Sequence, residues 1–180
     1  MSYLKKIIIF LIRRYHSQYA DTRLGDSVII NSFVFQKIFR INNHVSWPVH
    51  FTSVFKCVGK FDRGNRFPGL SPGGYFDARN GIVLGSEVRV GPHVKLISMN
   101  HDVTNYETYK DNEPIKIGDY CWLGAGVTVL PGVTLAEHIV CGAGSVVTKS
   151  FHEKNILIAG CPAKKVKNIG PIIESTKINK

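Results

Sequence analysis

Cysteine is scarce in this chain of 180 residues, and its four cysteines include no C-x-x-C pair. This absence argues against a short zinc-binding or redox motif. We expect the cysteines to be small core residues in a reducing compartment, rather than disulfides or nucleophiles. They are Cys57, Cys121, Cys141 and Cys161.

Acidic residues are few, with 13 Asp and Glu against 23 Lys and Arg, so the formal net charge is +10. Such an excess predicts an anionic partner. The basic residues are scattered through the termini and through residues 149–167, without a recognition helix or a basic strand interleaved with aromatics. We therefore expect no nucleic acid, and favour phosphate groups of small ligands or an anionic membrane surface.

Long apolar runs are absent. The run Ile7–Ile12 is too short to span a bilayer, and no small-residue cleavage site follows it, so we expect neither an anchor nor a signal peptide. Around it, residues at helical spacing predict an amphipathic helix within 1–20, flanked by two basic pairs. This helix either packs on the protein or a neighbouring subunit, or attaches peripherally to anionic lipid. Its apolar residues are Leu4, Ile7, Ile8, Leu11, Ile12 and Tyr15.

A six-residue period dominates residues 117–151. Six is neither a helical nor a strand period, so the chain turns a corner at fixed intervals. Three hexads close a triangular coil of about eighteen residues that rises about 4.8 Å. The first inward series, often followed by glycine or alanine, is Ile117, Leu123, Val129, Leu135, Cys141 and Val147. The second inward series is Cys121, Val127, Val133, Ile139, Ser145 and Phe151.

The same six-residue spacing recurs upstream at Leu84, Val90 and Leu96. Between Leu96 and Ile117, however, the spacing departs from a multiple of six by three residues. Part of residues 97–116 must therefore leave the coil as a projecting loop. Residues 25–55 are apolar but irregular, and we expect them to form the first coils. The predicted organisation is an N-terminal helix (1–20), a β-helical domain (21–168) and a C-terminal tail (169–180).

The segment IGDYCWLGAGVTVLPGVTLAEHIVCGAGSVVTKS, followed by IAGCPAKKVK, resembles the hexapeptide-repeat acyltransferases. These are left-handed parallel β-helix enzymes that move acetyl groups from acetyl-CoA, and the resemblance covers about residues 48–167. It alone implies the left-handed, all-β fold, because ordinary parallel crossovers are right-handed. The segment NHDVTNYETYKDNEPIKIG is similar to the branch that acts on sugars of surface polysaccharides. The implied location is the cytoplasm, either free or at the inner face of the membrane.

The resemblance implies that His101, in Asn100-His101-Asp102, is the catalytic base. A hydroxyl is a poor nucleophile at neutral pH, so its acylation by a thioester needs a base with a pKa of about 7. Asp102, a backbone carbonyl or another carboxylate would orient the imidazole, and Asn100 would position the acceptor or the loop. One coil earlier, Asp77 and Asn80 would hydrogen-bond sugar hydroxyls, or are plain turn residues.

The resemblance also implies an acetyl-CoA site without a metal. We expect Trp122 to face outward and line the site, and backbone groups beside Ala125 and Ala143 to meet the acetyl and pantetheine parts. Basic residues would hold the phosphates, although lysine lacks the bidentate fork of the arginine common in relatives. Alternatively, Thr148, Lys149, Lys164 and Lys167 are solvated charges or turn residues without a ligand. The full set is Trp122, Gly124, Ala125, Ala143, Thr148, Lys149, Lys164 and Lys167.

Related enzymes are homotrimers with active sites between subunits, and the resemblance implies the same here. The expected reaction is direct transfer from acetyl-CoA to a hydroxyl of a sugar, a glycan or a lipid-linked saccharide. Alternatives are an N-acetyltransferase of a nucleotide-linked amino sugar, a small-molecule or antibiotic O-acetyltransferase, and a non-catalytic assembly subunit. A zinc enzyme resembling the β-helical carbonic anhydrases is disfavoured, because the nearest histidine pairs are His44/His50 and His93/His101.

Overall fold

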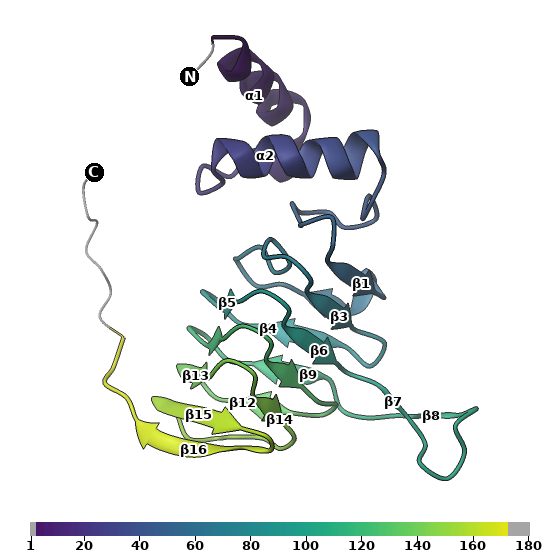
Figure 1. Cartoon of the computed structure of the whole chain (residues 1–180), viewed down its shortest axis with the longest axis vertical. Helices are drawn as coiled ribbons and strands as arrows, with labels where there is room; N and C mark the ends of the chain where they lie inside the picture. The colour runs from purple at the N-terminus through teal and green to yellow at the C-terminus, as the bar shows by residue number, and fades with distance from the viewer. Residues whose placement is uncertain (1–2, 173–180) are drawn as a thin grey trace.

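The computed structural model describes residues 3–172, which form a helical cap followed by a parallel β-helix (Figure 1). Helix α1 (Tyr3–Tyr15) and the short η1 (Ser17–Tyr19) precede α2 (Asp26–Phe33), which continues as the π-helical turn η2 (Val34–Ile38). The cap stands at the N-terminal end of the stack of coils, and α1 lies on the far side of α2 from the coils (Figure 1).

Three parallel sheets form the faces of the β-helix. The first comprises β1 (Val54–Lys56), β3 (Tyr75–Asp77), β6 (Lys95–Ile97), β11 (Thr128–Val129) and β14 (Val146–Val147). The second comprises β2 (Phe61–Asp62), β4 (Ile82–Leu84), β9 (Ile115–Ile117) and β12 (Thr134–Leu135). The third comprises β5 (Arg89–Val90), β10 (Trp122–Leu123), β13 (Ile139–Cys141), β15 (Ile156–Gly160) and the antiparallel β16 (Ala163–Asn168). A 3-10 turn, η3 (Val58–Lys60), joins β1 to β2.

The hexad prediction is confirmed. Strand β10 pairs with β13 at a separation of 18 residues, as in Trp122 with Val140. Both inward series are buried, apart from a half-buried Phe151. Glycine follows several inward residues because successive coils leave no room for a side chain. A Cβ on Gly124 would lie 2.8 Å from the Cys141 carbonyl oxygen of the next coil.

The predicted loop is confirmed as well. Across the insertion, β10 pairs with β5 at a separation of 33 residues, as in Trp122 with Arg89, so 15 residues leave the coil. They include the antiparallel hairpin of β7 (Asn100–His101) and β8 (Tyr109–Lys110), which projects from the prism (Figure 1).

The expectation that residues 25–55 form the first coils is wrong for residues 26–38, which are helical. Gly25 is the N-cap of α2, and Asp26 in the first turn interacts favourably with the helix dipole. Apolar residues of this segment, of α1 and of the chain between them form a second core, separate from that of the β-helix. The cap core contains Ile9, Ile12, Tyr19, Leu24 and Ile29.

One buried amide joins the cap to the chain that enters the coils. Gln36 is fully buried, and its amide nitrogen donates to the carbonyl of Trp47 at 3.0 Å. Its amide oxygen accepts from the Tyr19 hydroxyl at 3.2 Å. A polar side chain can occupy this junction because its donor and its acceptor are both used.

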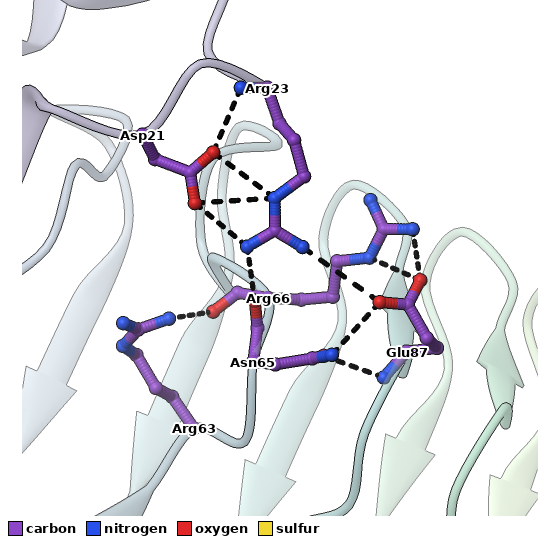
Figure 2. A network of polar contacts seen from close by, with 6 residues as sticks. All are labelled: Asp21, Arg23, Arg63, Asn65, Arg66 and Glu87. Carbon is purple, nitrogen blue, oxygen red and sulfur yellow. Dashed lines mark hydrogen bonds and ion pairs between the residues drawn. The ribbon is translucent and has the colours of Figure 1, made fainter.

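A polar network makes a second junction on the surface (Figure 2). Arg23 of the cap forms a bidentate pair with Asp21 and donates to the Asn65 carbonyl at 2.8 Å. Asn65 in turn donates to Glu87 at 2.9 Å, and Arg66 also binds Glu87. Arg63 donates to the Arg66 carbonyl. These contacts connect the cap to two successive coils.

The predicted C-terminal tail lies mostly outside the described residues, which end at 172. Before that point, β16 turns back along β15 and closes the last coil.

Candidate active site

The hairpin leaves the prism at one particular corner. Strand β6 belongs to the first sheet and β9 to the second, so the segment between Ile97 and Ile115 begins and ends where these two faces meet. The hairpin turn is stabilised locally, because the Asp102 carboxylate accepts from the Thr104 amide at 2.7 Å and from its hydroxyl. We call the projecting hairpin of β7 and β8 the arm, and His101 lies at its start.

The imidazole of His101 is held in one orientation. Its Nδ1 lies 2.5 Å from the Tyr106 carbonyl oxygen, and its ring packs on Tyr109 with 4.4 Å between centroids. A carbonyl oxygen only accepts, so Nδ1 carries a proton, and Nε2 is then the ring nitrogen that holds the free lone pair in a neutral imidazole. Of the three orienting groups considered from sequence, the geometry supports the backbone carbonyl, because the Asp102 carboxylate is used within its own turn.

Asp77 contributes to the arm indirectly. Its carboxylate is 1% exposed and accepts from Arg79 Nε at 2.9 Å and from Nη2 at 2.7 Å. Burial raises the pKa of Asp77, but the hydrogen bonds from Arg79 outweigh it, and the pKa lies below its usual value. The Arg79 guanidinium in turn lies 4.6 Å from the centroid of the Tyr109 ring. A series of contacts therefore runs from the buried carboxylate to His101.

Asn80 also contacts the arm. Its side-chain nitrogen donates to the Lys110 carbonyl at 3.3 Å, and its amide donates to Ser98 Oγ at 2.9 Å. Asn100 pairs with Lys110 in the hairpin ladder and its side chain is exposed. The structure thus brings Asn80, Asn100 and His101 to one corner. The engaged carboxylate of Asp77 favours an anchoring role for it over contact with a ligand.

Sequence reasoning missed three residues that shape this corner. Tyr106 supplies the carbonyl, Tyr109 the stacking ring, and Arg79 the contact with that ring. Arg79 could have been found, because an arginine two positions after an aspartate at a turn often closes a local ion pair. Nothing in the sequence marks the two tyrosines of the arm, because their role depends on how the hairpin folds back.

The residues that the sequence analysis assigns to the acetyl-CoA site are divided between the corners and faces of the prism. Thr148 and Lys149 follow β14 at the same corner as the arm, two coils further along. Ala125 and Ala143 lie at the corner between the third and first sheets. Within one chain, the face of the first sheet therefore separates the two alanines from the arm.

The exposed groups at these positions suit an elongated ligand. Trp122 is 54% exposed, which agrees with the outward orientation expected for it. The backbone amides of Ala125 and Ala143 donate to no group within residues 3–172. Lys164 and Lys167 are exposed on β16. Gly124 is explained by close coil packing, since a side chain there would meet the backbone of the next coil.

Comparison with known proteins identifies the fold and its relatives. A putative acetyltransferase of Schizosaccharomyces pombe is 43% identical over 91 residues, which are 49% of this chain and 44% of that protein. The galactoside O-acetyltransferase of Escherichia coli is 37% identical over 92 residues, with the same shares of 49% and 44%. The crystal structure of a maltose O-acetyltransferase from Clostridium difficile superposes with a TM-score of 0.50 at 32% identity, covering 54% of each chain.

Over about half of its length the chain is similar to named O-acetyltransferases, and its β-helix is the fold of a solved hexapeptide-repeat acetyltransferase from Vibrio cholerae, which superposes with a TM-score of 0.51 at 20% identity over 66% of each chain. The chain spans about half the length of the curated relatives it matches. No family model matches the sequence. A galactoside acetyltransferase solved in complex with coenzyme A also superposes on this acetyltransferase fold, with a TM-score of 0.50 and 28% identity over 59% of this chain and 57% of that one.

Within this acetyltransferase fold, the residues present fit coenzyme A chemically. Unpartnered amides match the amide links of a pantetheine arm, and exposed lysines match phosphates. No group of three or more His, Cys, Asp or Glu suited to hold a metal occurs in the part of the chain that the structure describes.

Proposed function

We propose that this protein transfers an acetyl group from acetyl-CoA to a hydroxyl group of a sugar, with His101 as the general base. The observation that carries the proposal is the hydrogen bond from His101 Nδ1 to the Tyr106 carbonyl, because it leaves Nε2 free to accept a proton. Relatives named as galactoside and maltose O-acetyltransferases support a sugar as the acceptor, and the neighbour solved with coenzyme A supports the donor.

In the proposed reaction, His101 Nε2 removes the proton of the acceptor hydroxyl as its oxygen attacks the thioester carbonyl. A backbone amide stabilises the oxyanion, and the imidazolium returns its proton to the departing thiolate of CoA. Transfer is direct. The inward cysteines are poor candidates for an acyl intermediate, because burial raises the pKa of Cys121 to about 11 and of Cys141 to about 12.

We further propose that the active form is a homotrimer. In a single chain His101 is exposed on its arm, and the corner with Ala125 and Ala143 lies across the first sheet. A neighbouring subunit packed beside the arm would bring its own Ala125 and Ala143 close to His101. It would also cover part of the exposed apolar surface around Trp122.

CoA release from acetyl-CoA over a panel of galactosides, maltose and other saccharides tests the function. We expect His101→Ala to lower kcat with a hydroxyl acceptor about 100-fold or more. The matched control is His44→Ala, which removes another exposed histidine from the chain before the coils. Equal rates for the two variants would contradict the assignment of the base. Turnover that disappears on dilution as the trimer dissociates would support the shared site, and full activity in a proven monomer would refute it.

We place the acceptor in a surface polysaccharide because the arm NHDVTNYETYKDNEPIKIG resembles that branch of the family. Mass spectrometry of surface glycans from cells with active protein and with His101→Ala would detect the missing acetyl group. An amino sugar is the second acceptor to include in the panel. An amine needs less help from a base, so His101→Ala would slow its acetylation much less.

A further inference from the structure

Helix α1 presents two apolar faces, and the structure buries only one of them. Ile9 and Ile12 are 7% and 6% exposed in the core of the cap. The other face is open to solvent, with exposures from 40% for Ile7 to 76% for Tyr15. Its residues lie at positions i, i+3, i+4, i+7 and i+11, so they form one stripe along the helix. We call this set the α1 stripe: Leu4, Ile7, Ile8, Leu11 and Tyr15.

The charges beside the α1 stripe all have the same sign. The helix carries Lys5, Lys6, Arg13 and Arg14, and its sequence YLKKIIIFLIRRY contains no acidic residue. None of these four cations forms an ion pair within residues 3–172. At 3.6 residues per turn only Lys5 and Arg14 flank the stripe, whereas Lys6 and Arg13 lie on the opposite side of the helix, where Arg13 donates to the Leu24 carbonyl at 3.1 Å. Phe10, which is 65% exposed, and Tyr3, which is 80% exposed, add apolar surface on the side of Arg14.

From this pattern we infer that α1 docks on an anionic lipid bilayer, with the stripe in the headgroup region and the flanking Lys5 and Arg14 on acidic lipids. An apolar stripe bordered only by cations is complementary to such a surface. A second copy of α1 is disfavoured as the occupant, because it would bring a second pair of like charges beside Lys5 and Arg14. Among the described helices none has the length and apolarity to cross a bilayer, so docking would occur at the interface.

Docking through α1 would also orient the rest of the protein. The cap is joined to the coils by Gln36 in the interior and by the Arg23 network at the surface (Figure 2). The stack of coils would therefore stand on the membrane with the cap as its base (Figure 1). This inference does not depend on the proposed acetyl transfer.

Cosedimentation of the full chain with vesicles tests the inference. Vesicles of phosphatidylcholine alone are compared with vesicles containing about 30% phosphatidylglycerol. We expect binding only to the acidic vesicles, and at least a tenfold loss between about 0.05 M and 0.5 M salt, because the charge attraction is screened. Ile8→Asp with Leu11→Asp should lower binding at least tenfold. The matched control, Val83→Asp, changes a residue of similar 41% exposure on the β-helix and should bind as the wild type does.

Three further measurements separate the outcomes. Circular dichroism and urea unfolding should show that Ile8→Asp with Leu11→Asp folds as the wild type does, since both side chains are exposed. Replacing Lys5 and Arg14 by Gln should reduce binding while leaving the stripe intact. The mass in solution without lipid should be equal for the wild type and the aspartate variant. Equal binding to both vesicle types, wild-type binding by the aspartate variant, or a lower oligomer mass of that variant would overturn the inference.

Discussion

Replacement of Arg79 by Met tests the connection between the buried carboxylate and the arm. Methionine keeps an unbranched apolar stem but removes the guanidinium that donates to Asp77 at 2.9 and 2.7 Å. The carboxylate is 1% exposed and would keep only the weaker bond from the backbone amide of residue 79 at 3.3 Å. Breaking a buried pair costs about 3–5 kcal/mol. Because the Arg79 side chain is 27% exposed, we expect a loss near the lower limit, about 3 kcal/mol.

The loss of stability should depend on pH. In the wild type the pKa of Asp77 is lowered, so its stabilising contribution is present above the unfolded pKa of about 3.9 and disappears as the pH falls through the folded pKa. In the variant, burial without the guanidinium raises the pKa of Asp77, and the cost is that of a buried charge. Protonation removes this charge, so the difference between the two proteins should shrink on going from pH 7 to pH 4.

Urea unfolding followed by tryptophan fluorescence measures these differences, because Trp47 is buried in the β-helix core. Asp77→Asn in the Arg79→Met background should recover part of the stability, since a neutral amide replaces the unpaired charge. Arg79→Lys keeps the positive charge but loses the bidentate guanidinium, so its free energy of unfolding should lie between those of the wild type and of Arg79→Met. A loss below about 1 kcal/mol at pH 7, equal to that at pH 4, would refute the reasoning.

The variant should also affect the arm. The Tyr109 ring would lose its cation–π partner, and His101 packs on this same ring with 4.4 Å between the centroids. We expect kcat to fall while KM for acetyl-CoA changes little, because the coils that we propose to hold the donor are not altered. A rise in that KM with unchanged kcat would separate Arg79 from the position of His101.

Three further predictions concern the packing of the coils and the cap. Gln36→Leu should cost about 2–3 kcal/mol in urea unfolding, because carbonyls at Trp47 and Val45 lose their buried donor; a near-neutral change would contradict this. Gly64→Ala should cost at least about 2 kcal/mol, because φ is +61° and the new Cβ would overlap the Gly85 carbonyl, whereas Gly144→Ala, with φ +71° and open space, should lose only about 1 kcal/mol. Ellman's reagent should label two thiols of the native protein and four after unfolding, because Cys121 and Cys141 are buried but Cys57 and Cys161 are exposed, so the expectation of a core position is wrong for these two; four fast thiols in the native state would contradict this core.

The β-helix could be predicted because its information is local and repeated. Each hexad carries the same two inward positions, and residues such as Leu123 and Cys141 superpose at 18-residue separation. A slip in the count was enough to locate the inserted arm. The helical cap was only partly predicted, because residues 26–38 carry no repeat, and their helix is stabilised by packing on α1 and by the burial of Gln36.

By itself, the sequence determined the inward faces of the coils, the place of the insertion and the histidine within it, since each follows from residue spacing along the chain. The tertiary structure alone decided which face of α1 is buried, because both faces have helical spacing and only contacts within the cap select Ile9 and Ile12. It also decided that a backbone carbonyl orients His101 and that Arg79 supports the ring beneath it. These contacts join residues whose separation in the sequence carries no signal, and they form only when the arm folds against the preceding coil.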